Sequence, residues 1–415
     1  SEGERALVTC PEGVAGLSPV CAKGTSMRIE GRDPLPLRVW TLLASLAAFI
    51  SASGCAAVRE GPAAGQEVVF FPAPASISAA GEWSLTIQGR IFEPAGQSAG
   101  RQAMITLAAR TLAPLLGVSP ADAEQSDRFR ERAGLLLSDS AGNTRVSVQL
   151  GEAPIALPAS DPAGYFTADL TLSAAQVAAL TRAGSISFAS LPNGANGKVF
   201  AGQVMPLAEE GVIVVSDVDD TIKVTNIRQQ REKLENTLLK PFAAVPGMAE
   251  LYRSWQAAFG PGMHFHIVSA GPWQLYEPLR RFTEDAAFPP FTWSMRSLDI
   301  GSPAAILAAL ATDARDYKRQ AIRALMTRFP KRHVVLVGDS GEQDPEVYAD
   351  IVDEFMDRVD AVFIRNVSGE GCSAERYRKL FADEGASKLS VFVDPGELPP
   401  LAPASPGRAL CAGRH

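Results

Sequence analysis

Three aspartates stand within four positions directly after an apolar run, in the stretch VIVVSDVDDTIK at residues 212–223. Carboxylates this close repel one another and resist removal from water, so the cluster is either a solvated turn or a site that holds a cation. Other polar residues also follow apolar runs: Ser269 follows HFHIV, and Asp339 and Asp344 follow HVVLV. Lys318 lies in a helical stretch before the last of these runs. Read together, these residues indicate one site.

The residue types indicate phosphoryl transfer assisted by a metal. Asp217, Asp219 and Asp339, with Asp344 nearby, cannot converge without a cation, and hard carboxylate oxygens suit Mg²⁺. One metal-bound carboxylate can attack phosphorus, and a second one, two residues on, can exchange protons with the leaving group and with water. Hydroxyl and ammonium groups can bind the phosphoryl oxygens.

The second half of the chain has the pattern of a parallel α/β sheet. Compact, mostly β-branched runs alternate with helical stretches; the runs are GVIVV (211–215), HFHIV (264–268), HVVLV (333–337) and AVFI (361–364). Near-continuous apolar strands of this kind lie in sheets covered by helices on both faces. The carboxyl ends of parallel strands meet at one edge, where such sheets carry their sites. We assign this domain to residues 208–367.

The flanking segments have other patterns. Residues 67–207 alternate short β-like runs with turn residues, which predicts a small antiparallel β-sandwich or barrel, interrupted by a helix near 101–117. Residues 368–415 lose the strand signals, and we expect a C-terminal extension ending in a Pro-rich tail.

The amino-terminal segment has the pattern of an export signal. Residues 1–26 lack a leading Met and are interpreted as a non-native upstream segment, and residues 27–54 combine a charged start, an apolar run and small residues. The ending ASGC resembles the lipobox of bacterial lipoproteins, which predicts a diacylated Cys55 followed by a tether over 55–66. An ordinary secretory signal with an incidental cysteine is the alternative.

Composition limits the remaining possibilities. The formal net charge of −7 over 415 residues argues against a protein that holds nucleic acid through a general basic surface. The five cysteines form no CxxC pair, which argues against a structural zinc site. A Cys372–Cys411 disulfide is possible in an oxidising compartment.

The ordered set of site residues resembles the four motifs of the haloacid dehalogenase superfamily, in its phosphatase branch. Longer stretches, including VSDVDDTIKVTNI, FHIVSAGPWQLYEPLRRF and HVVLVGDSGEQDPEVYADI, resemble the catalytic domain of the actin-patch phosphatidate phosphatase family, related to the lipins. The resemblance covers about residues 70–367, because GEWSLTIQGRIFEP and GYFTADLTL resemble the β-domain of bacterial members. It implies a Rossmann-like parallel sheet with little or no cap.

The resemblance also implies a role for each residue. Asp217 is the expected nucleophile, and Asp219 the general acid/base whose backbone carbonyl also binds metal. Thr221 completes the first motif, and Ser269 and Lys318 are expected to bind phosphate. The expected metal ligands are Asp217, Asp219, Asp339 and Asp344.

These observations predict a Mg²⁺-dependent phosphatase that acts through an aspartyl-phosphate on phosphatidate or a related membrane lipid phosphomonoester. The expected location is the bacterial cell envelope, facing the periplasm, with a lipid anchor at Cys55 and no nucleic-acid partner. Protein partners are unknown. Two alternatives stay open: a phosphatase for a soluble or protein phosphomonoester outside the cytoplasm, and a non-catalytic lipoprotein that binds lipid headgroups.

Several neighbouring residues have weaker expectations. Asp220 either caps a helix or tunes the metal site, and Glu342 is expected to point outward. Arg365 either contacts the substrate or ends its strand in solvent. His264 and His266 are expected to be structural, one on each face of their strand.

Overall fold

The computed structural model describes residues 57–95, 99–192, 197–311, 314–398, 401 and 409–411. The segments predicted as upstream sequence and signal, together with Cys55, lie outside these residues. Ala57–His415 forms one compact unit. None of the helices in the described part of the chain has both the length and the apolar character that a membrane span requires.

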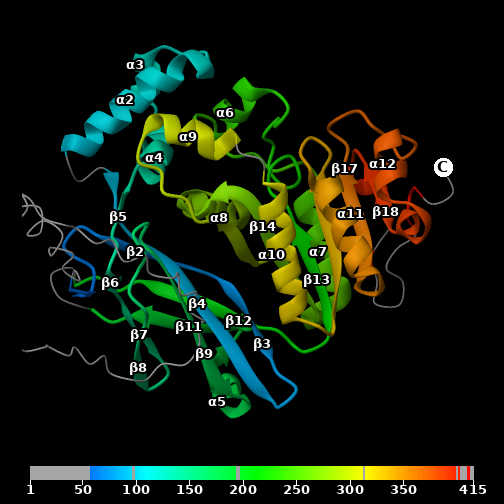
Figure 1. Ribbon diagram of the computed structural model, residues 1–415, viewed down its shortest axis with the longest axis horizontal. Coiled ribbons are helices and arrows are strands. Elements are labelled where there is room, and N and C mark those ends of the chain that lie inside the picture. Colours follow the sequence, from blue (N-terminus) through cyan, green and yellow to red (C-terminus); the bar gives the residue numbers. More distant parts are fainter. Residues whose placement is uncertain are drawn as a thin grey trace, which may run out of the picture. The chain divides into compact units, whose positions relative to one another are not determined.

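The second half of the chain folds around a six-stranded, fully parallel sheet (Figure 1). The strands are β13 (Gly211–Ser216), β14 (Met263–Pro272), β15 (Phe291–Arg296), β16 (Arg332–Asp339), β17 (Val359–Arg365) and β18 (Leu389–Phe392). Their order is β15-β14-β13-β16-β17-β18. Strands β14 and β15 therefore extend the sheet on one side of β13. The chain then returns, and β16, β17 and β18 extend the sheet on the other side. Such a reversal leaves a crevice at the carboxyl ends of the two central strands, β13 and β16.

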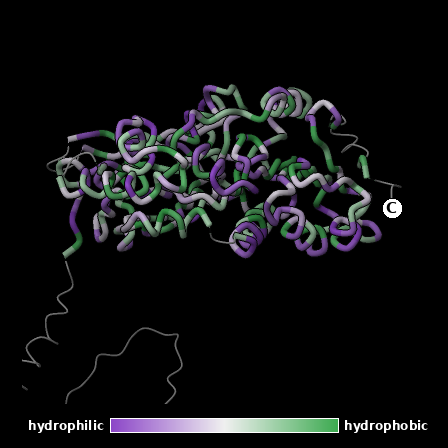
Figure 2. Tube along the Cα trace, turned by 90° about the horizontal axis from the view of Figure 1, so that it is seen from above, coloured by the Kyte–Doolittle hydropathy of each residue, from purple (hydrophilic) through white to green (hydrophobic). Residues whose placement is uncertain are grey.

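Helices cover both faces of this sheet because successive strand residues alternate between two cores. Val212 and Val214 face a core that includes α7 (Met248–Phe259) and α8 (Tyr276–Asp285). Ile213 and Val215 face a second core, to which three other helices contribute. Those are α10 (Arg315–Arg328), α11 (Asp344–Glu354) and α12 (Glu375–Leu380). In Figure 2, hydrophobic stretches run through the interior, and hydrophilic stretches gather on the outer helices and loops. The predicted parallel α/β sheet is confirmed.

The preceding β-rich region is one connected sheet of ten strands in which nearly all pairs are antiparallel. The strands are β2 (Glu67–Phe71), β3 (Ala73–Ile77), β4 (Glu82–Glu93), β5 (Asp139–Ser140), β7 (Ser147–Leu150), β8 (Ala153–Ala156), β9 (Tyr165–Ser173), β10 (Thr181–Arg182), β11 (Ser185–Ser190) and β12 (Ala201–Pro206). Phe70 of β2 makes edge-to-face contacts with Phe166 of β9 and Phe188 of β11, so distant strands pack on one core, as in a sandwich. The sheet differs from a purely antiparallel one because β3 and β12 pair in parallel.

Helices accompany this sheet. They are α2 (Ala99–Leu116), α3 (Pro120–Gln125), α4 (Asp127–Leu136) and α5 (Ala174–Leu180). α2 matches the helix predicted near 101–117. Contacts that join the β-rich region to the parallel-sheet region include a hydrogen bond from Arg328 of α10 to Thr86 Oγ1 at 2.7 Å and the stacking of Phe71 on Trp273 at 3.8 Å between ring centroids.

The structure corrects two segment predictions and contains the disulfide that the sequence left open. The predicted tether over 55–66 is not free throughout, because β1 (Arg59–Glu60) pairs with β6 (Thr144–Arg145). The extension over 368–415 adds the sixth strand, β18, to the parallel sheet, since LSVF places four buried side chains beside β17. The same extension is bonded back through a Cys372–Cys411 disulfide with the Cα atoms 5.2 Å apart.

Candidate active site

Asp217 follows β13 at the crevice between the two central strands. Its backbone N–H donates to Val337 O of β16 at 2.9 Å, so the neighbouring strand fixes the backbone that carries this carboxylate. Tyr252 of α7 donates to Ser216 Oγ, which in turn donates to Asp217 O at 2.7 Å. The loop is therefore held from the sheet and from the helix layer behind it.

Three buried carboxylates converge at this point. Asp217, Asp339 and Asp344 each offer an oxygen within 4.8 Å of the others, and their exposed fractions are 2%, 0% and 0%. Gly338 permits this approach, because a Cβ atom there would lie 2.4 Å from Asp344 Oδ2. Burial raises the pKa of Asp217 and of Asp339 well above the usual range, and the neighbouring Asp344 carboxylate raises both further.

The trio has the properties of a cation site. Asp339 Oδ1 accepts the backbone N–H groups of Gly341 and Glu342, whereas Asp339 Oδ2 is buried and has no partner among the described residues. A buried carboxylate oxygen without a partner is costly unless a positive charge faces it. Hard oxygen donors at this spacing fit Mg²⁺. The carboxylate of Asp219 is not part of the trio, so only its backbone carbonyl is left for the metal role assigned to it.

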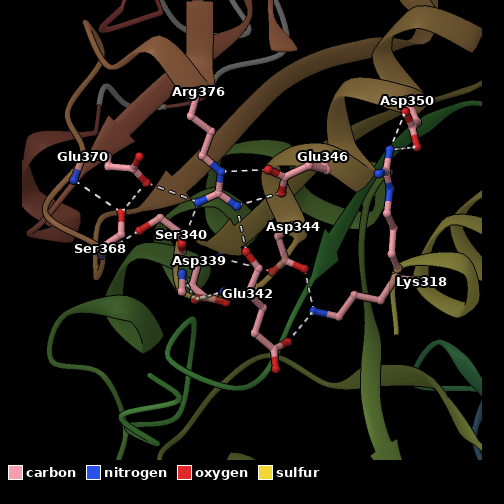
Figure 3. Close-up of polar contacts among 12 residues, drawn as sticks. Lys318, Asp339, Ser340, Glu342, Asp344, Glu346, Asp350, Ser368, Glu370 and Arg376 are labelled. Carbon is pink, nitrogen blue, oxygen red and sulfur yellow. Dashed lines mark hydrogen bonds and ion pairs between the residues drawn. The ribbon is translucent and has the colours of Figure 1, made fainter. Parts of the chain in front are cut away.

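Lys318 of α10 is the ammonium of this cluster. Its Nζ lies 2.8 Å from Asp217 Oδ1. It also lies 2.5 Å from Asp344 Oδ1 and 3.2 Å from Glu342 Oε2 (Figure 3). Burial acts to lower the pKa of Lys318, but these three carboxylates outweigh it and raise the pKa well above its usual value. Lys318 is therefore a fixed positive charge beside Asp217. The expectation that Glu342 points outward is wrong, because its carboxylate turns to this ammonium.

Asp219 has its own cationic partner. Lys223 Nζ lies 2.7 Å from Asp219 Oδ1, and Thr225 Oγ1 donates to the same oxygen at 2.6 Å. Burial acts to raise the pKa of Asp219, but Lys223 and Thr225 outweigh it and lower the pKa below its usual range. The side chain of Asp219 is 26% exposed, so it borders the pocket and is not sealed beneath it.

Asp220 shapes the loop that carries Lys223. It adopts a left-handed backbone conformation with φ of 54°, and its carboxylate accepts the backbone N–H groups of Thr225, Asn226 and Ile227. Arg365, at the end of β17, donates to Asp220 O at 2.8 Å. Asp220 is thus a loop-organising residue and caps no helix, and Arg365 is bonded to this loop rather than ending in solvent.

A small pocket opens above these groups. Ser269, Asp219 and Lys233 lie on its polar side, and Leu279 and Leu310 are among its apolar lining residues. Its volume is about 50 Å³. The walls come from α6 (Gln230–Leu238), α8 and α9 (Pro303–Ala311) and from the segments before α7 and α8. Helices α6, α8 and α9 therefore supply part of the wall of a site for which little or no cap is expected.

The remaining predicted hydroxyls lie beside the same groups. Thr221 Oγ1 is 3.4 Å from Asp217 Oδ2, and Ser269 Oγ accepts the N–H of Gly271 at 3.1 Å. Both side chains are buried. The structure therefore brings every predicted site residue to one edge of the sheet.

The part of the chain that carries this site is similar to known proteins. Residues 212–366 match the family model described as "Phosphatidate phosphatase APP1, catalytic domain". The chain is 28% identical over 158 residues to phosphatidate phosphatase APP1 of Saccharomyces cerevisiae, covering 37% of this chain and 26% of that protein. It is 29% identical over 178 residues to an uncharacterised protein of Schizosaccharomyces pombe, covering 42% of this chain and 28% of that protein.

Residues 212–366 are therefore similar to the APP1 catalytic-domain family. The chain thus carries a phosphatidate phosphatase-like domain. It spans little more than a quarter of the length of the two curated relatives. The matched segment contains every predicted site residue, but it ends before α12 and β18.

Sequence reasoning missed two polar residues of the APP1-type domain and its C-terminal extension. Lys233 of α6 lines the pocket, and its positive charge contributes to the lowered pKa of Asp219. Arg376 of α12 contacts the loop between Asp339 and Asp344. A lysine on an exposed helix and an arginine beyond the catalytic motifs carry no sequence signal of their own.

The two histidines of β14 also differ from expectation. His264 Nε2 and His266 Nδ1 both lie 2.7 Å from the hydroxyl of Thr292, and His266 Nε2 lies 3.0 Å from Ser294 Oγ. They share one face of the strand, because strand side chains repeat every two residues. Both are buried and structural.

Proposed function

We propose that the protein is a Mg²⁺-dependent phosphatase that cleaves phosphatidate or a related membrane lipid phosphomonoester through an aspartyl-phosphate. The observation that carries this proposal is the convergence of the Asp217, Asp339 and Asp344 carboxylates, with Lys318 beside Asp217. One oxygen of Asp339 is also buried and has no partner among the described residues. The parallel strand order supports a haloacid dehalogenase-type fold. The family match supports the phosphatase class.

Asp217, Asp339 and Asp344 would hold the Mg²⁺, together with the Asp219 backbone carbonyl. When bound, the ion supplies positive charge that offsets the negative charge of the phosphoryl group. Lys318 supplies a second positive charge, and the hydroxyls of Thr221 and Ser269 would donate to phosphoryl oxygens.

The reaction would proceed in two displacements. A carboxylate oxygen of Asp217 attacks phosphorus as the bond to the alcohol oxygen breaks, and Asp219 gives that oxygen a proton. Asp219 then takes a proton from water, whose oxygen attacks the aspartyl-phosphate and releases phosphate and Asp217. As Lys223 lowers the pKa of Asp219, the acid half-reaction needs an opposing influence. The negative charge of an arriving phosphate favours protonation of Asp219 and supplies that influence.

The pocket supports a lipid substrate. Its volume of about 50 Å³ accommodates little more than a small polar group, so acyl chains would stay outside. Its apolar wall includes Leu275, Leu279, Phe242 and Leu310. A phosphomonoester with apolar atoms close to the phosphate satisfies both sides of such a pocket. A soluble phosphomonoester is the alternative outcome of the test below.

The test measures phosphate release by the purified protein from phosphatidate vesicles and from glycerol 3-phosphate, which shares the headgroup but lacks the acyl chains. We expect release from the vesicles with Mg²⁺ and none with EDTA. Asp217→Asn should lower turnover about a thousandfold or more, since it removes the nucleophile. Asp353→Asn, an exposed position on α11, is the matched control. Normal turnover by Asp217→Asn would refute the nucleophile assignment, and a preference for glycerol 3-phosphate would refute the lipid substrate.

We also propose that Cys55 is acylated and holds the protein at the cell envelope of a bacterium. Labelling cells with a fatty-acid analogue tests this, with Cys55→Ser as the control. Equal labelling of the two proteins would contradict the anchor.

A further inference from the structure

The loop between the predicted metal ligands Asp339 and Asp344 is held by a residue outside the matched catalytic segment. Arg376 of α12 donates through Nη1 to Ser340 O and through Nη2 to Glu342 O, both at 2.8 Å (Figure 3). Its Nε and Nη2 also contact the two carboxylate oxygens of Glu346 at 2.8 and 2.7 Å. All three nitrogens of the guanidinium therefore have partners, and the side chain is 21% exposed.

The contact with Ser340 O bears directly on Asp339. The peptide group between Ser340 and Gly341 is planar and trans, so its C=O and N–H point in opposite directions. Its C=O accepts from Arg376, and its N–H donates to Asp339 Oδ1 at 2.6 Å. Fixing the carbonyl thus fixes the amide that holds Oδ1 of the Asp339 carboxylate. That carboxylate offers one oxygen to the trio with Asp217 and Asp344, and its Oδ2 has no partner among the described residues.

The rest of the C-terminal extension holds this arrangement in place. Ser340 Oγ accepts the backbone N–H groups of Val367 and Ser368, both at 2.9 Å. Glu370 lies 3.4 Å from Arg376 Nη1, and the disulfide from Cys372 joins the segment to Cys411. The backbone N–H of Cys411 donates to Leu389 O of β18. The segment before α12 is thereby attached to the edge of the sheet.

We propose that Arg376 is a positioning residue for the metal site. By binding two carbonyl groups of the loop, it presets the Asp339 carboxylate for a divalent cation, and the C-terminal extension that carries it is part of the metal site's support. The inference rests on the proposed Mg²⁺ site. A simpler role, an ion pair between Arg376 and Glu346 that only stabilises the fold, makes different predictions.

The experiment titrates Mg²⁺ alone into the metal-stripped full chain and follows the rise in melting temperature, without substrate. We expect Arg376→Ala to raise the Mg²⁺ concentration at half effect about tenfold or more, the size usual for residues that orient metal ligands. Glu346→Gln removes the ion pair but keeps Arg376 and both loop carbonyls. It should lower the melting temperature with little change in the Mg²⁺ midpoint. Arg378→Ala, an exposed position on the same helix, is the control for loss of an arginine.

Two further measurements separate positioning from charge. Arg376→Lys retains the positive charge near Glu346 and Glu370, but lysine lacks the planar fork that reaches two carbonyl groups, so its Mg²⁺ midpoint should shift as in Arg376→Ala. This variant also decides the question if Arg376→Ala does not fold. Millimolar guanidinium should partly restore the midpoint of Arg376→Ala by filling the vacated position.

The inference is overturned if both Arg376 variants bind Mg²⁺ within about twofold of the wild type, or if Glu346→Gln shifts the midpoint as much as they do. It is also overturned if Mg²⁺ produces no shift in the wild-type protein. Because no substrate is used, failure of the proposed function is separately visible. Suppose that the wild type binds Mg²⁺, that this binding depends on Arg376, and that the protein releases no phosphate. This result would refute the proposed phosphatase activity and leave the positioning role of Arg376 unchanged.

Discussion

Acidification should destabilise the protein through the buried histidines of β14. His266 is 2% exposed, and both of its ring nitrogens face hydroxyl groups, those of Thr292 and Ser294. Burial lowers its pKa from 6.5 to about 3. His264 shares the Thr292 hydroxyl, and burial, with smaller contributions from His266 and Arg332, lowers its pKa well below the usual value.

The sign and size of the effect follow from proton linkage. The folded-state pKa lies below the unfolded one, so the unfolded chain binds the proton first and stability falls as pH drops below about 6.5. The contribution of neutral His266 to stability is fully present above pH 6.5. It decreases as the pH falls from 6.5 to the folded-state pKa of about 3. Each pH unit in this window costs about 1.4 kcal/mol for His266. Between pH 6.5 and 5.0 the loss is therefore about 2 kcal/mol.

The assay compares urea unfolding of the wild type with that of His266→Gln at pH 7.5 and pH 5.0. Glutamine can still form hydrogen bonds to both hydroxyl groups, but it does not titrate. The carboxylates of the protein contribute equally to the pH dependence of unfolding in the wild type and in the variant. We expect the difference in unfolding free energy between the two proteins to shift by about 2 kcal/mol in favour of the variant at the lower pH. A difference that does not change with pH would refute the assignment of a buried neutral imidazole.

Three further outcomes test the supports of the site by thermal or urea unfolding. Replacing both Cys372 and Cys411 with serine should lower the free energy of unfolding by about 4 kcal/mol, because the disulfide closes a loop over a sequence separation of 39. An unchanged free energy of unfolding would contradict the disulfide. Asp220→Ala should cost about 3 kcal/mol and lower activity, because three loop amides lose their acceptor, whereas Asp220→Asn should retain much of both. Arg132→Met should lower the free energy of unfolding by about 2–3 kcal/mol, because this buried guanidinium donates to two carbonyl groups at the end of α6. An unchanged unfolding midpoint would show that those hydrogen bonds do not contribute to stability.

The strands that form the centre of the parallel sheet were predictable from their sequence. GVIVV and HVVLV correspond to β13 and β16, because apolar residues on both faces of a strand require a sheet covered on both sides. β15 and β18 were not predicted. The first is written FTWSMR, with polar and apolar residues mixed, and the second is a four-residue run beside a Pro-rich segment. Edge strands with such sequences depend on pairing partners that composition does not reveal.

The site also combines residues that were predictable from the sequence with contacts that were not. Asp217 follows β13, Ser269 lies near the end of β14 and Asp339 ends β16. These strands are neighbours in the sheet, and the rule that parallel strands end at one edge was enough to group the three residues. The direction of the Glu342 side chain depends on Lys318, which is 24 positions away in the sequence. The role of Arg376 depends on where two backbone carbonyl groups point. Neither the direction of Glu342 nor the role of Arg376 can be predicted from the spacing of neighbouring residues, because both depend on how separate elements pack.

The charges of the site indicate the order in which ligands bind. Asp217, Asp339, Asp344 and Glu342 carry four negative charges when ionised, and Lys318 supplies one positive charge among them. The raised pKa of Asp217 and of Asp339, caused first by burial, shows that the cluster favours a proton when no other cation is present.

A phosphate dianion would therefore meet net repulsion until a divalent cation enters, so we expect Mg²⁺ to bind first. Inorganic phosphate, the product, should raise the melting temperature of the protein with Mg²⁺ present and leave it unchanged in EDTA. An equal shift under both conditions would mean that Lys318 and the neighbouring hydroxyls hold phosphate by themselves. The carboxylate trio would then need another explanation.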